Sequence, residues 1–86
     1  MSNQFIIRVY DMEWDMYMYY VAGLTLYTWS SSPSDAQAYT MYDSAVSRRN
    51  TLKRILRERN EYDRKYKDLE IIPVKIVVKL TEGEQG

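Results

Sequence analysis

Strict alternation of apolar with other side chains near both ends of the chain is the feature that most limits how it can fold. In the segment 4–11, Phe5, Ile7 and Val9 occupy every second position, and residues 69–80 repeat the same period. Alternate side chains of an extended backbone point to opposite faces, so this period predicts two β-strands. In the second strand, one face is expected to meet the core through Ile72, Val74, Ile76, Val78 and Leu80.

Two further strands are expected between these ends. Residues 16–21 are rich in Met, Tyr and Val, which suit a pleated surface. The acidic run 11–15 before them breaks the apolar pattern, as a hairpin turn does. Gly23 can supply a second tight turn because glycine accepts positive φ, and residues 24–29 then read as a third strand.

A loop, a short strand and one helix are expected in the middle of the chain. Ser, Pro and Asp dominate residues 30–35 and predict a loop, after which residues 36–42 are read as a short fourth strand. Asp43 or Ser44 is the expected helix N-cap, because its side-chain oxygen can accept from a first-turn amide. Apolar residues then recur at helical spacing and predict a stripe that faces the core: Ala45, Leu52, Ile55 and Leu56, continuing to Tyr62 and Tyr66.

These elements predict an α+β fold: an antiparallel sheet of four to five strands with one α-helix packed on one face, in the order β-β-β-(β)-α-β. The chain of 86 residues is long enough for one hydrophobic core and too short for two. We therefore expect residues 1–86 to form a single domain.

Composition removes much of the usual catalytic chemistry. The chain has no Cys and no His, so disulfides, thiolate metal sites and the commonest general base are absent. No nucleophile motif or Gly-rich phosphate loop is present, and we expect no enzyme activity, cofactor or bound metal. The carboxylates of Asp11, Glu13 and Asp15 could hold a hard cation, but their spacing lacks the features of a calcium loop, which favours a solvated turn. With no membrane span or leader peptide in the sequence, the cytoplasm is the expected location.

Aromatic residues concentrate in the first three expected strands and their turns. One helix covers one face of a sheet, so the other face is expected to carry exposed rings, which are typical of interface hot spots. Two alternatives are ring stacking on a half-wet sheet and base stacking on nucleic acid. The residues expected at a protein interface are Trp14, Tyr17, Tyr19, Tyr27 and Trp29.

Charge is balanced over the chain but not along it. Residues 1–43 carry one basic and five acidic residues, whereas residues 44–67 carry nine basic and three acidic ones. The basic residues of the expected helix could contact nucleic-acid phosphates or an acidic partner, or could form its solvated face. The candidate contacts are Arg48, Arg49, Lys53, Arg54 and Arg57.

Three segments carry a resemblance to known proteins: YYVAGLTLYTW, then SSSPSDAQAYTMYDSAVSRR, and finally LEIIPVKIVV. In their order the chain resembles small accessory proteins encoded by phages and other mobile elements of Gram-positive bacteria. This resemblance implies stoichiometric inhibition of a host defence protein, in the manner of anti-CRISPR proteins. The expected partner is a host protein or a protein–nucleic acid complex, with a homodimer as a further possibility. The alternative function is that of a small nucleic-acid-binding regulator that uses the basic helix.

Overall fold

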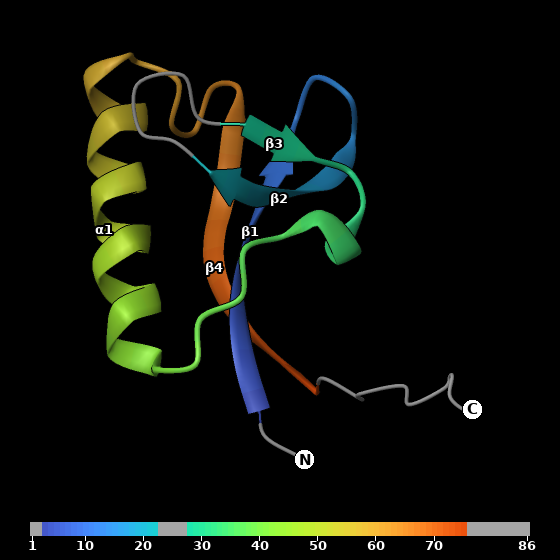
Figure 1. Cartoon of the computed structure of the whole chain (residues 1–86). Helices are drawn as coiled ribbons and strands as arrows, with labels where there is room; N and C mark the ends of the chain where they lie inside the picture. Colours follow the sequence, from blue (N-terminus) through green and yellow to red (C-terminus); the bar gives the residue numbers. More distant parts are fainter. Residues whose placement is uncertain (1–2, 23–27, 76–86) are drawn as a thin grey trace.

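Residues 3–22 and 28–75 are described by the computed structural model, and they form the α+β fold that the sequence predicts (Figure 1). Within these ranges a four-stranded antiparallel sheet has the order β3-β2-β1-β4, and one helix packs on one of its faces. The elements in chain order are β1 (Asn3–Asp11), β2 (Met16–Ala22), β3 (Thr28–Ser30), the 3₁₀ turn η1 (Pro33–Asp35), α1 (Tyr42–Glu58) and β4 (Tyr66–Lys75).

The core lies between α1 and the β1–β4 pair, which run side by side along the helix in Figure 1. The alternation in β1 points Ile7 and Val9 toward the helix, and both are fully buried. From α1, the predicted stripe contributes Leu52 and Leu56, which are also fully buried. Removing a side chain of this size from water stabilises the folded state by about 1.5–3 kcal/mol.

The face predicted for the last strand is wrong. Ile71 pairs with Ile7 and packs against the core, whereas Ile72 pairs with Ile6 on the opposite face. The strand begins earlier than expected, and its register shifts near Asp68, whose φ is 54°. A change of one residue in register exchanges the two faces of a strand, so Val74 also points away from the helix. Residues 76–80 of this prediction lie outside the described residues.

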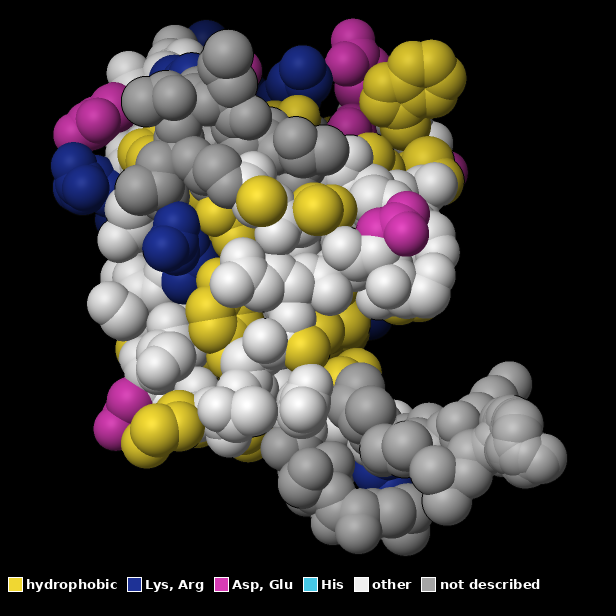
Figure 2. All heavy atoms as spheres, in the orientation of Figure 1, with side chains coloured by type: hydrophobic (Ala, Val, Ile, Leu, Met, Phe, Trp, Pro, Cys, Tyr) yellow, Lys and Arg dark blue, Asp and Glu magenta, His cyan; other side chains and the backbone are white. Residues whose placement is uncertain are grey.

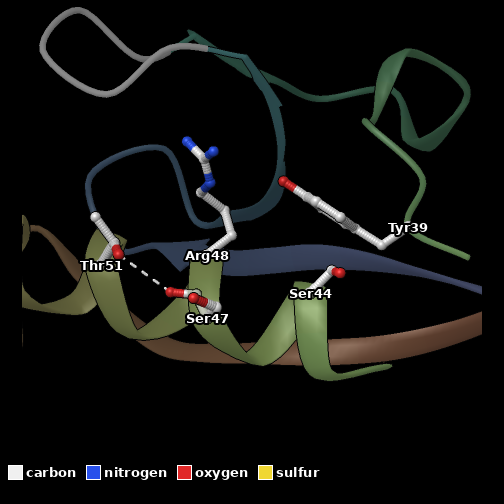
Figure 3. Close-up of a pocket in the computed structure, with 5 residues that line it drawn as sticks. All are labelled: Tyr39, Ser44, Ser47, Arg48 and Thr51. Carbon is white, nitrogen blue, oxygen red and sulfur yellow. Dashed lines mark hydrogen bonds between the residues drawn. The ribbon is translucent and has the colours of Figure 1, made fainter. Parts of the chain in front are cut away.

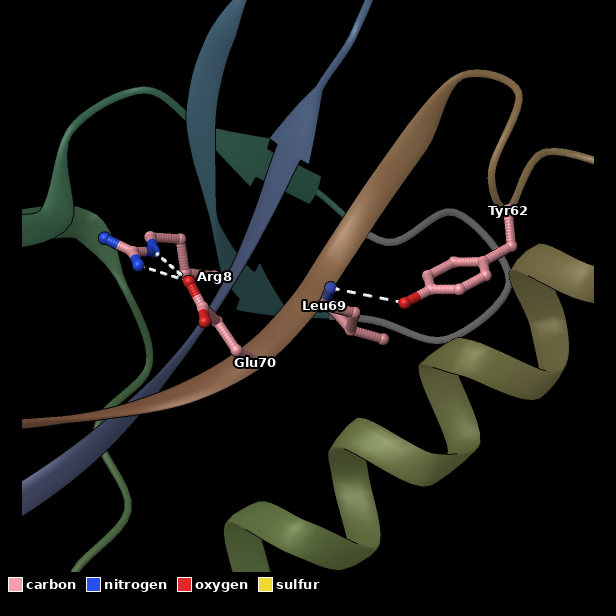
Figure 4. Close-up of polar contacts among 4 residues, drawn as sticks. All are labelled: Arg8, Tyr62, Leu69 and Glu70. Carbon is pink, nitrogen blue, oxygen red and sulfur yellow. Dashed lines mark hydrogen bonds and ion pairs between the residues drawn. The ribbon is translucent and has the colours of Figure 1, made fainter.

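The outer edge of β4 lacks two of its hydrogen-bond donors, at Pro73 and Leu69. Phe5 exchanges both of its backbone hydrogen bonds with Tyr39, so it makes none to Pro73, its partner in β4. The backbone nitrogen of Pro73 therefore faces the outer edge, where its lack of a hydrogen leaves no donor. Four residues earlier, the N–H of Leu69 donates to the hydroxyl of Tyr62 at 3.4 Å (Figure 4).

The expected fourth strand at residues 36–42 is reduced to a single bridge. Tyr39 pairs with Phe5, and the N–H of Gln37 donates to the carbonyl of Tyr20 at 2.9 Å. β2 pairs with β1 only from Met16 to Tyr19. Beyond that point, the segment before α1 that contains Tyr39 takes the place of β2 beside β1. Most of the expected third strand, residues 24–27, lies outside the described residues.

The helix begins and ends before the predicted positions. Its N-cap is Met41, which makes no side-chain capping bond, so the expected capping by Asp43 or Ser44 is wrong. It ends at Glu58, where Asn60 adopts a left-handed φ of 59°. Such a residue is a common helix terminator. The stripe therefore does not continue to Tyr66, which belongs to β4.

Candidate functional site

The turn between β1 and β2 is held by a buried carboxylate. Asp11 is 4% exposed, and its Oδ1 accepts hydrogen bonds from the backbone N–H groups of Glu13 at 2.9 Å and Trp14 at 3.1 Å. The N–H of Met12 donates to the carbonyl of Lys65 at 2.9 Å, which joins the turn to the segment before β4. The backbone that carries Trp14 is therefore fixed from two sides.

Apolar side chains crowd this turn although it is solvated. Trp14 is 72% exposed, and Met12, Met16 and Tyr17 are exposed as well. We call residues 12–17 the hairpin tip. Figure 2 shows hydrophobic and acidic side chains together at the upper right, where Figure 1 places the β1–β2 turn. A large exposed ring on a fixed backbone is typical of a protein-binding anchor.

Tyr17 continues the hairpin tip onto the face of the sheet opposite α1. Its ring meets the edge of Tyr10 at a centroid distance of 5.2 Å, and the Arg8 guanidinium carbon lies 4.0 Å from its centre. Arg8 in turn donates two hydrogen bonds to one carboxylate oxygen of Glu70 (Figure 4). Burial lowers the pKa of Arg8, but its bond to Glu70 and the charge of that carboxylate outweigh burial and raise the pKa overall. These contacts hold the ring of Tyr17 in one place.

The structure divides the five aromatic residues predicted at the interface. Trp14 and Tyr17 are exposed at the hairpin tip, and Tyr19 is half-buried on the same face of β2 as Tyr17. Trp29 instead packs on the helix side of the sheet, so its expected place on the open face is wrong. It pairs with Tyr20, which points into the core, and therefore shares that face. Tyr27 lies outside the described residues.

Sequence reasoning did not assign Met12 and Met16 to the interface. The sequence did contain a signal for their exposure. Met12 lies within the acidic run 11–15 and Met16 directly follows it, and acidic residues keep a hairpin turn in contact with water. The open face of the sheet is also less bare than expected, because Ile6 is buried and η1 packs against β2. Among the described residues, the large exposed apolar side chains thus lie mostly at the hairpin tip, with Met41 and Tyr42 at the start of α1 as the others.

The predicted basic residues of α1 do not form one continuous row. Arg48 turns inward and donates to the hydroxyl of Tyr20 at 3.1 Å, whereas Arg54 lies 3.5 Å from the carboxylate of Glu58. Arg49 donates to the side chain of its neighbour Asn50 at 3.1 Å. A shallow groove on α1 brings several of them together, and its lining is Asn50, Lys53, Arg54, Arg57 and Glu58.

The carboxylates of the acidic turn do not converge on one point. Asp11 is committed to backbone amides, and Glu13 lies 4.0 Å from the ammonium group of Lys65. Among residues 3–22 and 28–75, no three acidic side chains form a group that could hold a metal ion. In the same ranges, α1 is neither long nor apolar enough to cross a membrane.

Comparison of the chain with protein-family models, curated proteins and solved structures found no match. The resemblance to phage accessory proteins therefore stays a prediction.

Proposed function

We propose that this chain is a non-catalytic binding protein that docks its hairpin tip onto another protein. The observation that carries the proposal is Trp14, which is 72% exposed on a turn held by the buried carboxylate of Asp11. Tryptophan is enriched among residues whose truncation costs most at interfaces. Because the turn is already ordered, little conformational entropy is lost when the ring enters a pocket.

The charges around Trp14 define the partner further. Glu13 and Asp15 flank Trp14 in sequence and are exposed, and the ammonium group of Lys65 lies 4.0 Å from the Glu13 carboxylate. A complementary surface has an apolar pocket for the indole and basic residues at its rim. The proposed partner is therefore a protein with a basic rim around an apolar pocket. A host defence protein that binds nucleic acid has this character, and stoichiometric occupation of its surface would inhibit it.

Affinity capture with matched variants tests this proposal. The tagged chain is incubated with bacterial lysate in nuclease-treated and untreated halves, and retained proteins are identified by mass spectrometry. Trp14→Ser removes the proposed anchor, whereas Met41→Ser removes an exposed apolar side chain that lies before α1. We expect one host protein to be retained equally in both halves by the parent chain and by Met41→Ser, and to be lost with Trp14→Ser.

Two results contradict the proposal. Retention of the same protein by Trp14→Ser rules out the anchor. Retention of the parent chain's partners only in the untreated half assigns binding to nucleic acid instead.

Nucleic-acid binding by α1 is the second candidate, supported by the groove that Lys53, Arg54 and Arg57 line. It predicts affinity for DNA or RNA that falls steeply with salt, because each phosphate contact releases counterions. Replacing Lys53 and Arg57 with Gln should then reduce the dependence on salt as well as the affinity. Unchanged binding in that variant contradicts this candidate.

A further inference from the structure

A second hollow lies between α1 and the connection that precedes it, away from the hairpin tip. Tyr39 comes from the connection, and one flank of the helix supplies the rest of the lining: Ser44, Ser47, Arg48 and Thr51 (Figure 3). Each of these helix positions lies three or four residues from two others, which places them on the same side of the helix. The lining therefore consists of four hydroxyl groups and one guanidinium, with no carboxylate.

Arg48 is positioned to present its charge to this hollow. One of its terminal nitrogens donates to the hydroxyl of Tyr20 at 3.1 Å, and this bond anchors the side chain against the sheet. A guanidinium carries five N–H donors in a rigid plane, so most of them remain for other acceptors. In Figure 3 the side chains of Arg48 and Tyr39 extend toward the same space above the helix.

The hydroxyl of Tyr39 needs an acceptor. It is buried, and no group in the described part of the chain forms a hydrogen bond with it. A buried tyrosine hydroxyl normally has a partner, since leaving it without one destabilises the fold. Burial raises the pKa of Tyr39, although the charge of Arg48 opposes this, so the hydroxyl keeps its proton and remains a donor.

We propose that this pocket binds a phosphate-type oxyanion. Guanidinium and hydroxyl groups are among the donors that bind phosphate oxygens in proteins, and charge-assisted bonds from arginine are among the strongest of these contacts. The donors come from two elements and can approach an anion from more than one side, which suits a tetrahedral anion better than a flat carboxylate. Thr51 donates to the carbonyl of Ser47 at 3.1 Å, so the main contacts fall to Arg48, Tyr39 and the serine hydroxyls.

NMR titration of the ¹⁵N-labelled full chain tests the site directly. Inorganic phosphate, sulfate and acetate are added in parallel while sodium chloride keeps the ionic strength constant. For phosphate we expect saturable shifts confined to the amides of Tyr39 and residues 44–51. We expect acetate to bind at least about tenfold more weakly.

Three variants identify the groups responsible. Arg48→Gln should weaken phosphate binding about tenfold or more, because it removes the charge-assisted bonds. Tyr39→Phe should weaken it severalfold, since it deletes only the hydroxyl. Arg64→Gln is the matched control, an exposed arginine that lines neither this pocket nor the groove of Lys53, and should bind within about twofold of the parent chain. If Arg48→Gln does not fold by circular dichroism, Tyr39→Phe and Ser44→Ala decide the question.

Titration with O-phosphoserine and adenosine monophosphate separates a free ion from a phosphate group carried by a larger molecule. Either source supports the site if binding still depends on Arg48 and Tyr39. Shifts that do not saturate, equal affinity for acetate and phosphate, or equal loss with Arg64→Gln overturn it.

Discussion

Two groups of aromatic residues, identical in chemistry, have opposite roles in this molecule. In the core, Trp29 stacks on Tyr66 at a centroid distance of 5.8 Å and meets the edge of Tyr20 at 5.9 Å. At the hairpin tip, Trp14 is mostly exposed and Tyr17 is fixed by side contacts. The difference shows that the position of a ring on the backbone, in a paired strand or on a turn, decides which rings hold the fold together and which are available to a partner.

Backbone geometry explains the two roles. Trp29 is the pairing partner of Tyr20 in β2, so both rings lie on the helix side of the sheet. Trp14 belongs to no strand and stands on a turn whose amides are bonded to Asp11. A ring in the core contributes through burial, whereas a ring on a fixed turn leaves its contact area for binding.

The largest difference between the two groups is expected when each tryptophan is replaced by alanine. Trp29→Ala should reduce the free energy of unfolding by about 3–5 kcal/mol, because it leaves a cavity beside Tyr20 and Tyr66. Trp14→Ala should change it by less than about 0.5 kcal/mol, because the side chain is mostly in water already. Urea denaturation followed by circular dichroism measures both values. Equal losses would show that Trp14 also supports the fold, which would remove the contrast.

A smaller loss of stability is expected at Asp11, the last residue of β1, whose carboxylate holds the hairpin tip. Asp11→Ala should cost about 1–3 kcal/mol in stability, since two backbone amides lose a charged acceptor. Asp11→Asn keeps one side-chain oxygen as an acceptor and should lose less. Heteronuclear NOE values of residues 12–15 should fall in Asp11→Ala and stay near those of the parent chain in Asp11→Asn. A turn that stays rigid in both variants would show that other contacts hold Trp14.

The smallest effect is expected for the ion pair beneath Tyr17. The side chains of Arg8 and Glu70 are 24% and 40% exposed, so solvent screens their attraction. A double-mutant cycle with Arg8→Met and Glu70→Gln should give a coupling free energy of about 1 kcal/mol or less. Coupling well above this value would make the pair part of the core rather than support for the ring of Tyr17.

The sequence was sufficient for the architecture and for the exposure of Trp14. Alternation and helical spacing act locally, so β1 and the core stripe of α1 followed from them. The face of β4 did not, because it depends on the register shift near Asp68, which no local pattern encodes. The position of Trp29 likewise depends on its pairing with Tyr20, a contact between strands.

The hollow beside Tyr39 could not be predicted for the same reason. It exists because β2 leaves β1 after Tyr19 and the connection before α1 comes into its place. Ser44, Ser47 and Arg48 read in sequence as an ordinary polar helix flank. Only the contact between Tyr39 and Phe5, residues distant in the chain, turns that flank into the wall of a pocket.

The edge of β4 determines how copies of this protein can meet. A free strand edge is a template on which a further strand, from another copy or from a misfolded chain, can add by backbone pairing. Here Pro73 offers no hydrogen and the N–H of Leu69 is already bonded to Tyr62, so two donor positions on that template are missing, one on each side of Ile71. This edge is therefore a poorer template for growth of the sheet into dimers or fibrils than a fully hydrogen-bonding strand. High protein concentrations should accordingly favour contacts through side chains, above all those of the hairpin tip, over continuation of the sheet.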